Sequence, residues 1–361
     1  MRNKLTKLFA LLLIVTISNC AYAKIWRLNN NGNNQIPAIT SDFPSSTTLQ
    51  QAHDNVSVAN GDTIHVEQSP TTYGNCIFSK RLVLIGAGYF LNSNPNTQVN
   101  NSWGATVGNL TFYTAASAGT QIYGLTTANL YMGVNNLLIG RCNITGITYI
   151  GNTSTTNIDG MTLRQNYFNV SSQTAIQNNS GTGSVTNMTI QNNIIVPLGY
   201  TSGISLGANV SGLIKSNYVA SYYGVITVYN FYVVDNICYS SANSVNTFYN
   251  CNIEFNAGNI AAHFQAPNGT NNTVGTGNLV KSLAQVAFVG GTSPDAYYQL
   301  GAGSEVKTVG KDGVDLGVFA ADYPYKLSGI APVPNIYGLV IDPISPGAAT
   351  IHVTVTAKGN N

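Results

Sequence analysis

Asparagines recur through the middle of the chain in the same local sequence context, at intervals of 19 to 27 residues. Most occurrences follow a short run of β-branched or apolar residues, such as Phe231-Tyr232-Val233 before Asn236. The recurring residues are Asn143, Asn166, Asn193, Asn217, Asn236, Asn256 and Asn278. A period of this size is typical of stacked repeats, in which each coil packs on its neighbours, and not of one globular core.

The position three before these asparagines is aliphatic in five coils, at Leu163, Ile190, Ile214, Val233 and Ile253, whereas Gly140 occupies it in the earliest coil. Stacking coils about 4.8 Å apart turns this position into an apolar column inside a solenoid. Asparagine suits the turn because it tolerates left-handed backbone, and its amide can bond to the next asparagine along a ladder. The pattern therefore predicts an all-β parallel β-helix in which the asparagines are structural.

The first 23 residues have the three parts of a secretory signal peptide. Three basic residues precede an apolar stretch at residues 8–17, and Ala21-Tyr22-Ala23 supplies a cleavage site. The apolar stretch is too short to cross a bilayer. We expect cleavage after Ala23 and a secreted, extracellular or cell-surface protein without a transmembrane segment. Lipoprotein anchoring at Cys20 remains an alternative.

Charged residues are scarce in the mature chain. Removing the three basic residues of the leader leaves 12 Lys and Arg against 13 Asp and Glu, a formal net charge of −1. Residues 83–284 carry seven charged side chains, namely Arg141, Asp159, Arg164, Lys215, Asp235, Glu254 and Lys281. With so few basic residues, the chain cannot gain affinity for nucleic acid by releasing counterions from the phosphates. It also has no basic patch that would bind a membrane surface.

Four cysteines follow the leader: Cys76, Cys142, Cys238 and Cys251. Cys238 and Cys251 occupy positions that carry apolar residues in other coils, so both are expected as small core residues. A disulfide between these two remains an alternative. The thiols and the four histidines form no metal-binding spacing, so no metal site is predicted.

Residues 48–88 predict a short helix that covers an edge, a Gly61-Asp62 turn and three strands separated by turns. This order resembles the opening of secreted proteins of the pectate-lyase-like superfamily. The resemblance implies a right-handed parallel β-helix with three strands per coil. It divides the chain into a cap and first coil at residues 24–81, the β-helix at 82–290 and a closing element with a C-terminal tail at 291–361.

The tail contains five prolines after residue 323 and ends in an alternating apolar and polar stretch at residues 350–356, which predicts a strand. We expect it to fold back on the last coils as a cap. A small appended β-module or an export-sorting signal remains the alternative.

The resemblance also implies what an enzyme on this scaffold would need. Lyases use several carboxylates to hold calcium and an Arg or Lys as base, whereas hydrolases cluster two or three aspartates. The sequence lacks the NTD, DD and GHG motifs of polygalacturonases and the DPHE motif of alginate epimerases. No catalytic residue is therefore transferred from the family to this chain, and no cofactor is predicted.

One column is a weak catalytic candidate. Two before the asparagines lie Arg141, Arg164, Gln191, Lys215, Val234 and Glu254, with Asp235 beside them. Arg164 or Lys215 could act as base while Asp235 and Glu254 hold Ca²⁺ against an acidic polysaccharide. The alternative is that these are solvated surface charges of little consequence.

Tyrosines are the other candidates, because Tyr218, Tyr222, Tyr223, Tyr229 and Tyr232 crowd two consecutive coils. Exposed tyrosines stack on sugar rings and supply hydroxyl groups, so they could form a glycan platform. Surface filling without a ligand is the alternative, and alternation along the strand must point some of the five inward.

Two functions from different classes follow. The first is a non-catalytic, monomeric surface protein that presents a polar and aromatic face to glycans or envelope components. The second is a lyase or hydrolase of acidic polysaccharide, resembling those of pectin or alginate, which alone would require Ca²⁺. The enzyme hypothesis is strengthened if Lys215, Asp235 and Glu254 converge with Arg164 in one groove. It is weakened if these residues scatter or if the tail blocks the groove.

Overall fold

The computed structural model describes residues 23–30, 42–94, 103–152, 155–171, 173–181, 183–199, 201–223, 225–242, 244–291, 293–320, 322–341 and 350–360. The predicted signal peptide up to residue 22, which includes Cys20, lies outside these residues, as do Pro343 and Pro346 of the tail.

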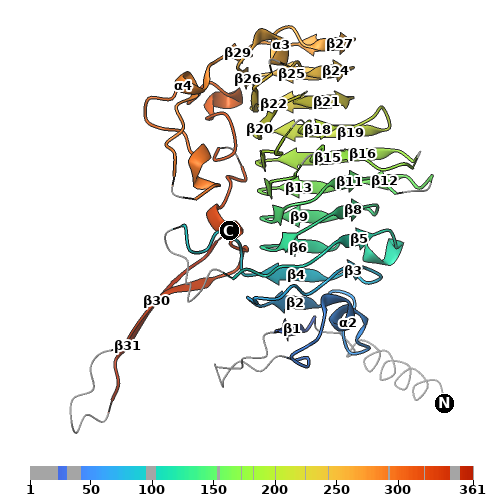
Figure 1. Ribbon diagram of the computed structural model, residues 1–361, viewed down its shortest axis with the longest axis vertical. Coiled ribbons are helices and arrows are strands. Elements are labelled where there is room, and N and C mark those ends of the chain that lie inside the picture. The colour runs from blue at the N-terminus through green and yellow to red at the C-terminus, as the bar shows by residue number, and fades with distance from the viewer. Residues whose placement is uncertain are drawn as a thin grey trace, which may run out of the picture.

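Three parallel β-sheets run along the long axis of the molecule, and each coil between β6 and β27 contributes to all three sheets (Figure 1). Counted over the described residues, sheets 1, 2 and 3 contain 12, 8 and 9 strands. A strand of sheet 1 pairs with the sheet 1 strand of the next coil, and the same holds for the other sheets. The chain is a right-handed parallel β-helix, and the prediction from the repeats is confirmed.

The strands of sheet 1 are β1 (Ile25–Leu28), β2 (Thr63–Val66), β4 (Val83–Gly86), β6 (Gln121–Tyr123), β9 (Leu138–Gly140), β12 (Ile158–Asp159), β13 (Thr162–Arg164), β16 (Val185–Gln191), β19 (Val210–Lys215), β22 (Phe231–Val234), β25 (Asn252–Glu254) and β28 (Thr273–Val274). Those of sheet 2 are β7 (Thr126–Thr127), β10 (Asn143–Ile144), β14 (Tyr167–Phe168), β17 (Ile194–Ile195), β20 (Tyr218–Ser221), β23 (Ile237–Ser240), β26 (Ala257–Gly258) and β29 (Leu279–Val280). Those of sheet 3 are β3 (Cys76–Ile77), β5 (Leu110–Phe112), β8 (Leu130–Met132), β11 (Thr148–Ile150), β15 (Ile176–Asn178), β18 (Ile204–Ser205), β21 (Ile226–Tyr229), β24 (Thr247–Tyr249) and β27 (Asn268–Thr270).

The interior of the helix is an apolar column on sheet 1, in which each member lies opposite the next; its members are Ile139, Leu163, Ile190, Ile214, Val233 and Ile253. All six side chains have 0% exposed surface. Burying an aliphatic side chain of this size stabilises the fold by about 1.5–3 kcal/mol. The column therefore holds the coils in one register.

The asparagine ladder fills the corner between sheets 1 and 2. Each Nδ2 donates to the Oδ1 of the next member at 2.9–3.1 Å, through Asn166, Asn193, Asn217, Asn236, Asn256 and Asn278. The same side-chain amide also bonds to the main chain of the preceding coil. Asn217, for example, donates to the Ile190 carbonyl at 2.8 Å and accepts from the Asn193 amide at 2.9 Å. The ladder satisfies buried polar groups that would be costly if left unpaired.

Asn143 is not a member of the ladder, contrary to the prediction. It lies opposite Tyr167 in sheet 2, and the ladder position of that coil is Cys142, whose amide donates to Asn166 Oδ1 at 2.9 Å. The adjacent asparagine shifted the predicted register by one residue. With Cys142 in place, Ile139 is the interior residue of the coil, and the apparent exception at Gly140 disappears.

The left-handed residue of each corner is the one before the ladder position, not the asparagine itself. The φ angles are between 52° and 59° at Arg141, Gln165, Asn192, Ser216, Asp235 and Phe255. Left-handed backbone costs about 1–2 kcal/mol for a residue with a side chain. We attribute its persistence in every coil to the ladder, because the turn directs the following asparagine into the buried corner.

The two ends of the helix are covered by short helices, α2 (Leu49–Asp54) and α3 (Ala261–Phe264), as Figure 1 shows. The Thr48 hydroxyl accepts from the Gln51 amide, and Gln51 bonds back to Thr48, so α2 begins with a capping box. At the other end the Phe264 ring stacks on Phe248 at 6.2 Å. The predicted N-terminal cap is confirmed.

After the last coil the chain turns back along the outer face of sheet 2 (Figure 1). This segment, residues 283–331, contains α4 (Leu283–Val286), η2 (Ala296–Tyr298), η3 (Lys311–Gly313) and η4 (Leu327–Gly329), whereas η1 (Ala115–Ser117) belongs to an early coil. It forms a second apolar cluster with sheet 2, which includes Tyr167, Ile194, Tyr218, Ile237, Ala257, Val286, Val306, Leu316, Val318 and Tyr325. It reaches the coil of β4, where the Tyr89 amide donates to the Ser328 carbonyl at 2.8 Å. The segment thus covers most of sheet 2 and not only the last coils.

The chain then forms an antiparallel hairpin of β30 (Asn335–Ile341) and β31 (Val353–Lys358), which projects from the helix (Figure 1). All six residues of β31 are exposed. The predicted terminal strand is therefore present, but it pairs with the tail itself and not with the coils.

The four cysteines are buried and free. Burial raises the pKa of the Cys142 thiol to about 12, which makes it a poor nucleophile. The disulfide between Cys238 and Cys251 that the sequence left open is not formed.

Candidate functional site

The charged column on sheet 1 is covered by the returning segment. Arg164, Lys215 and Glu254 do share an outward column, with Gln191 and Val234 between them. Arg141 does not belong to it, because Gly140 pairs with Arg164.

Each charged member of this column meets a residue of the segment. Lys215 Nζ lies 3.4 Å from Asp322 Oδ2, and the Arg164 guanidinium lies 4.5 Å from the Tyr323 ring centre. Glu254 pairs with a lysine of η3, described below. Among the described residues, each charged member of the column thus contacts the segment, the arrangement that weakens the enzyme hypothesis.

Lys311 fastens the segment to sheet 1. Its Nζ lies 2.8 Å from Glu254 Oε1 and 2.5 Å from Tyr232 Oη, and the Tyr232 hydroxyl donates to the same carboxylate. These two hydrogen bonds hold the pKa of Glu254 below its ordinary 4.5. We call the group formed by Lys311, Tyr232 and Glu254 the latch.

Asp235 is buried beneath η3, with 1% of its surface exposed. Its Oδ1 accepts from the Lys311 amide at 2.7 Å, whereas its Oδ2 has no hydrogen-bond partner among the described residues. Burial raises the pKa of this carboxyl above 3.8, although the nearby Lys215 and Lys311 charges oppose the shift. Asp235 lies at the corner and faces the segment, and its main-chain partner Lys311 also binds Glu254. In the part of the chain that the structure describes, no three His, Cys, Asp or Glu side chains gather to hold a metal ion.

The five candidate tyrosines lie on different faces. Tyr218 is 5% exposed, and its ring packs 4.5 Å from Tyr298 and 5.2 Å from Phe288, so it cannot be a surface platform. Tyr229 lies on sheet 3, with its ring stacked on Tyr249 at 4.4 Å, so that one ring face is covered. Tyr232 belongs to the latch.

Tyr222 and Tyr223 remain at the surface, 36% and 51% exposed, after the strand β20. Their rings meet edge to face at 4.7 Å. Strand alternation explains the scatter, because neighbouring residues in a strand point to opposite sides and each coil turns through three sheets.

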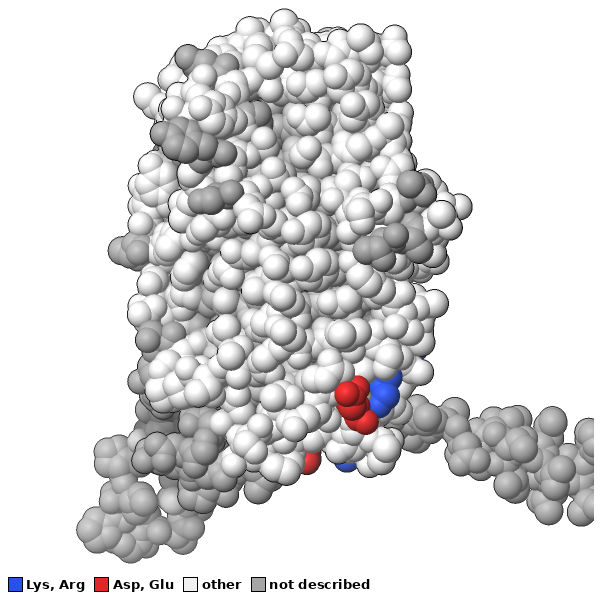
Figure 2. All heavy atoms as spheres, turned by 45° about the vertical axis from the view of Figure 1, so that its right-hand side comes forward, with Lys and Arg blue, Asp and Glu red and all other residues white. Residues whose placement is uncertain are grey.

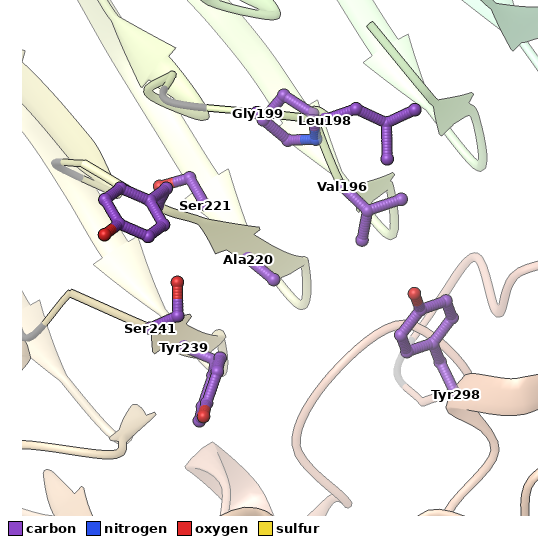
Figure 3. Close-up of a pocket in the computed structure, with 10 residues that line it drawn as sticks. Val196, Leu198, Gly199, Ala220, Ser221, Tyr239, Ser241 and Tyr298 are labelled. Carbon is purple, nitrogen blue, oxygen red and sulfur yellow. The ribbon is translucent and has the colours of Figure 1, made fainter. Parts of the chain in front are cut away.

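Tyr222 borders an open pocket of about 560 Å³ on the outer face of sheet 2. Three consecutive coils supply its floor, through Val196, Ala220 and Tyr239. Figure 3 shows Tyr298 of η2 approaching from the returning segment, opposite Ser221 and Ser241. Leu198, 54% exposed, closes another side.

The chemistry of this pocket is aromatic, hydroxylic and uncharged. Tyr222, Tyr239 and Tyr298 offer three rings, and Ser221 and Ser241 add hydroxyl groups. Aromatic rings with a few polar groups in a concave site suit a sugar ring, which has apolar C–H faces and a rim of hydroxyls. None of the ten lining residues is charged.

The sequence predicted Tyr222 as a binding residue but not the other residues that line the pocket. Val196 and Tyr239 lie three residues after Asn193 and Asn236, so the repeat register could have placed them together with Ala220. Tyr298 could not be found in this way, because it comes from the returning segment, outside the repeats.

Sheet 3 presents a second uncharged surface. Its outward column runs in register through Thr111, Tyr131, Tyr149, Gln177, Ser205, Thr227 and Thr247. Figure 2 shows this side of the molecule almost free of Lys, Arg, Asp and Glu, except near its lower end. The rings of Tyr131 and Tyr149 stack on each other at 4.9 Å, so this face offers edges and hydroxyls rather than open ring faces.

No protein-family model, curated protein or solved structure matches this chain. Among the described residues, no helix has the length and apolar character needed to cross a bilayer.

Proposed function

We propose that this chain is a secreted or cell-surface β-helix protein of the pectate-lyase-like superfamily that binds glycans without cleaving them. The pocket on sheet 2 is its binding site. The observation that carries the proposal is the lining of this pocket, where three tyrosine rings and two serine hydroxyls meet without a charged side chain.

The absence of charge from the lining bears on the ligand. An acidic polysaccharide such as pectin or alginate would bring carboxylates next to Tyr239 and Ala220, where no cation compensates them. An uncharged sugar loses less hydration at this site and stacks on the rings. We therefore propose that the ligand is a neutral glycan.

The covered column on sheet 1 supports the non-catalytic part of the proposal. A lyase needs a base and cation-bound carboxylates that reach the substrate. Here Arg164, Lys215 and Glu254 each contact the returning segment instead.

The test is a binding screen and a cleavage assay on the same purified mature protein. Neutral hexasaccharides (cellohexaose, xylohexaose, chitohexaose) are compared with hexagalacturonate and hexamannuronate by calorimetry. Product formation is followed by ultraviolet absorbance and by reducing ends, with and without Ca²⁺. We expect at least one neutral hexasaccharide to bind and none of the five to be cleaved. Binding confined to the acidic sugars, or release of products, would contradict the proposal.

A further inference from the structure

A second pocket, of about 630 Å³, lies between the returning segment and the base of the hairpin. The segment contributes residues around η4, and β31 contributes residues 356–358 with the two that follow. This pocket shares no lining residue with the pocket on sheet 2. Tyr298, the last residue of η2, lines the pocket on sheet 2, whereas the next residue, Gln299, has extended backbone and lines the second pocket.

Three cations gather at this second pocket. Lys326 and Lys358 line it, and Arg141 lies against its wall, donating from Nη1 to the carbonyls of Ile330 at 2.9 Å and Asn360 at 2.6 Å. Burial, and then the nearby charges of Arg141 and Lys358, lowers the pKa of Lys326. The three positive charges are thus close enough to repel one another.

These cations lack a counterion within the described part of the chain. Arg141, Lys326 and Lys358 form no ion pair there, whereas Arg27, Lys215, Lys281 and Lys311 each have a carboxylate partner. Because the mature chain has 12 basic residues in all, the gathering of three at one pocket is a specific feature of the fold. Clustered cations in a concave site concentrate anions.

The other residues that line this pocket indicate which groups the ligand must carry besides its negative charge. Phe319, Leu327 and Ile330 are apolar, and Gln299 and Thr356 can donate hydrogen bonds. Inorganic anions would leave the apolar wall without a contact. We infer that this pocket binds an organic oxyanion, a small molecule or glycan substituent that carries a carboxylate or a phosphoryl group.

Such a ligand would also connect two parts of the chain. Lys326 belongs to the returning segment and Lys358 to β31, so an oxyanion between them links the hairpin to the body of the protein. An isolated two-stranded hairpin is marginally stable in water. Binding is therefore expected to slow amide hydrogen exchange in residues 353–360.

The experiment titrates the purified mature protein with glucuronate, glucose 6-phosphate and glucose, which share a ring and differ in charge. Binding is measured by calorimetry and hydrogen exchange by mass spectrometry. We expect the two acids, but not glucose, to bind and to protect residues 353–360, and added salt to weaken this binding. Whichever of glucuronate and glucose 6-phosphate binds more tightly shows whether the pocket prefers a carboxylate or a phosphoryl group.

The variants Lys326→Met and Lys358→Met remove a charge and keep most of the apolar length. Each should weaken binding of the preferred acid at least about tenfold. Lys307→Met, in the same segment but outside the pocket lining, should leave it unchanged. Equal binding of glucose, or unchanged affinity in Lys326→Met, would overturn the inference.

Discussion

Lys311 Nζ lies 2.8 Å from Glu254 Oε1, and this contact joins the returning segment to the outward face of sheet 1. The same lysine donates its main-chain amide to Asp235, so one residue engages two of the four carboxylates and cations that the sequence offered as catalytic candidates. These contacts hold the returning segment against sheet 1.

The first prediction concerns this latch. Glu254→Gln removes the charge and should speed amide exchange in residues 308–318 while leaving the coils unchanged, because partly exposed ion pairs contribute little to global stability. Since the pKa of Glu254 is held below 4.5, the latch is intact above that pH and weakens as the pH falls through the lowered value. A large fall in the melting temperature of the whole protein would mean that Glu254 supports the helix itself.

The second prediction concerns the unpaired oxygen of Asp235. Its raised pKa means that the folded protein holds this proton more tightly than the unfolded chain. That contribution is fully present below about pH 3.8 and is lost as the pH rises through the raised value. Asp235→Asn should therefore raise stability at pH 7, by about 1 kcal/mol, and the gain should shrink toward pH 4. Thermal melts at both pH values check this, and a destabilised variant at pH 7 would show that Oδ2 has a partner in solution.

The third prediction concerns the ladder. Asn217→Ala leaves the Asn193 amide and the Ile190 carbonyl of the preceding coil without this partner, and it removes the side-chain hydrogen bond to Asn236 of the next coil. The loss should exceed that from Asn278→Ala, because Asn278 ends the ladder and is 9% exposed, so that water can reach the Asn256 amide and the Ile253 carbonyl that it leaves. Chemical denaturation of both variants makes the comparison. Equal losses would mean that the ladder does not act as a connected unit.

The fourth prediction concerns the interior column. Ile190→Asp places a charge where the exposed surface is 0%, and it should prevent folding. Ile190→Val is the matched control, with an expected cost of about 0.5–1.5 kcal/mol. Circular dichroism and the yield of soluble protein report the outcome. An unchanged melt of the Asp variant would contradict the register of the column.

The repeat pattern was sufficient for the architecture because the helix is nearly one-dimensional, and each coil obeys the same local rule. The aliphatic column and five of the six ladder contacts expected between successive asparagines follow directly from that rule. The error at Asn143 arose where Cys142 holds the ladder position beside an asparagine. Spacing alone could not separate two adjacent residues, whereas the aliphatic Ile139 three before Cys142 would have done so.

The site was less predictable, because it depends on the segment that returns outside the repeats. The repeat register placed Lys215 and Glu254 in one outward column, as found. No feature of the neighbouring sequence indicated that Asp322 and Lys311 would contact them. For the same reason, the sequence could not predict that Tyr298 and Tyr239 line the same pocket. Contacts between residues far apart in sequence and outside any period carry no local signal.

The central proposal, binding of a neutral glycan on sheet 2, is tested most directly by a matched pair of tyrosine substitutions. Tyr239→Ala removes a ring from the pocket floor, whereas Tyr249→Ala removes one from the stacked pair on sheet 3. The affinity of both variants is measured for the neutral hexasaccharide that binds the native protein most tightly. We predict a loss of about tenfold or more for Tyr239→Ala and no change for Tyr249→Ala. Unchanged affinity in a folded Tyr239→Ala protein, or an equal loss in both variants, would contradict the assignment of the site.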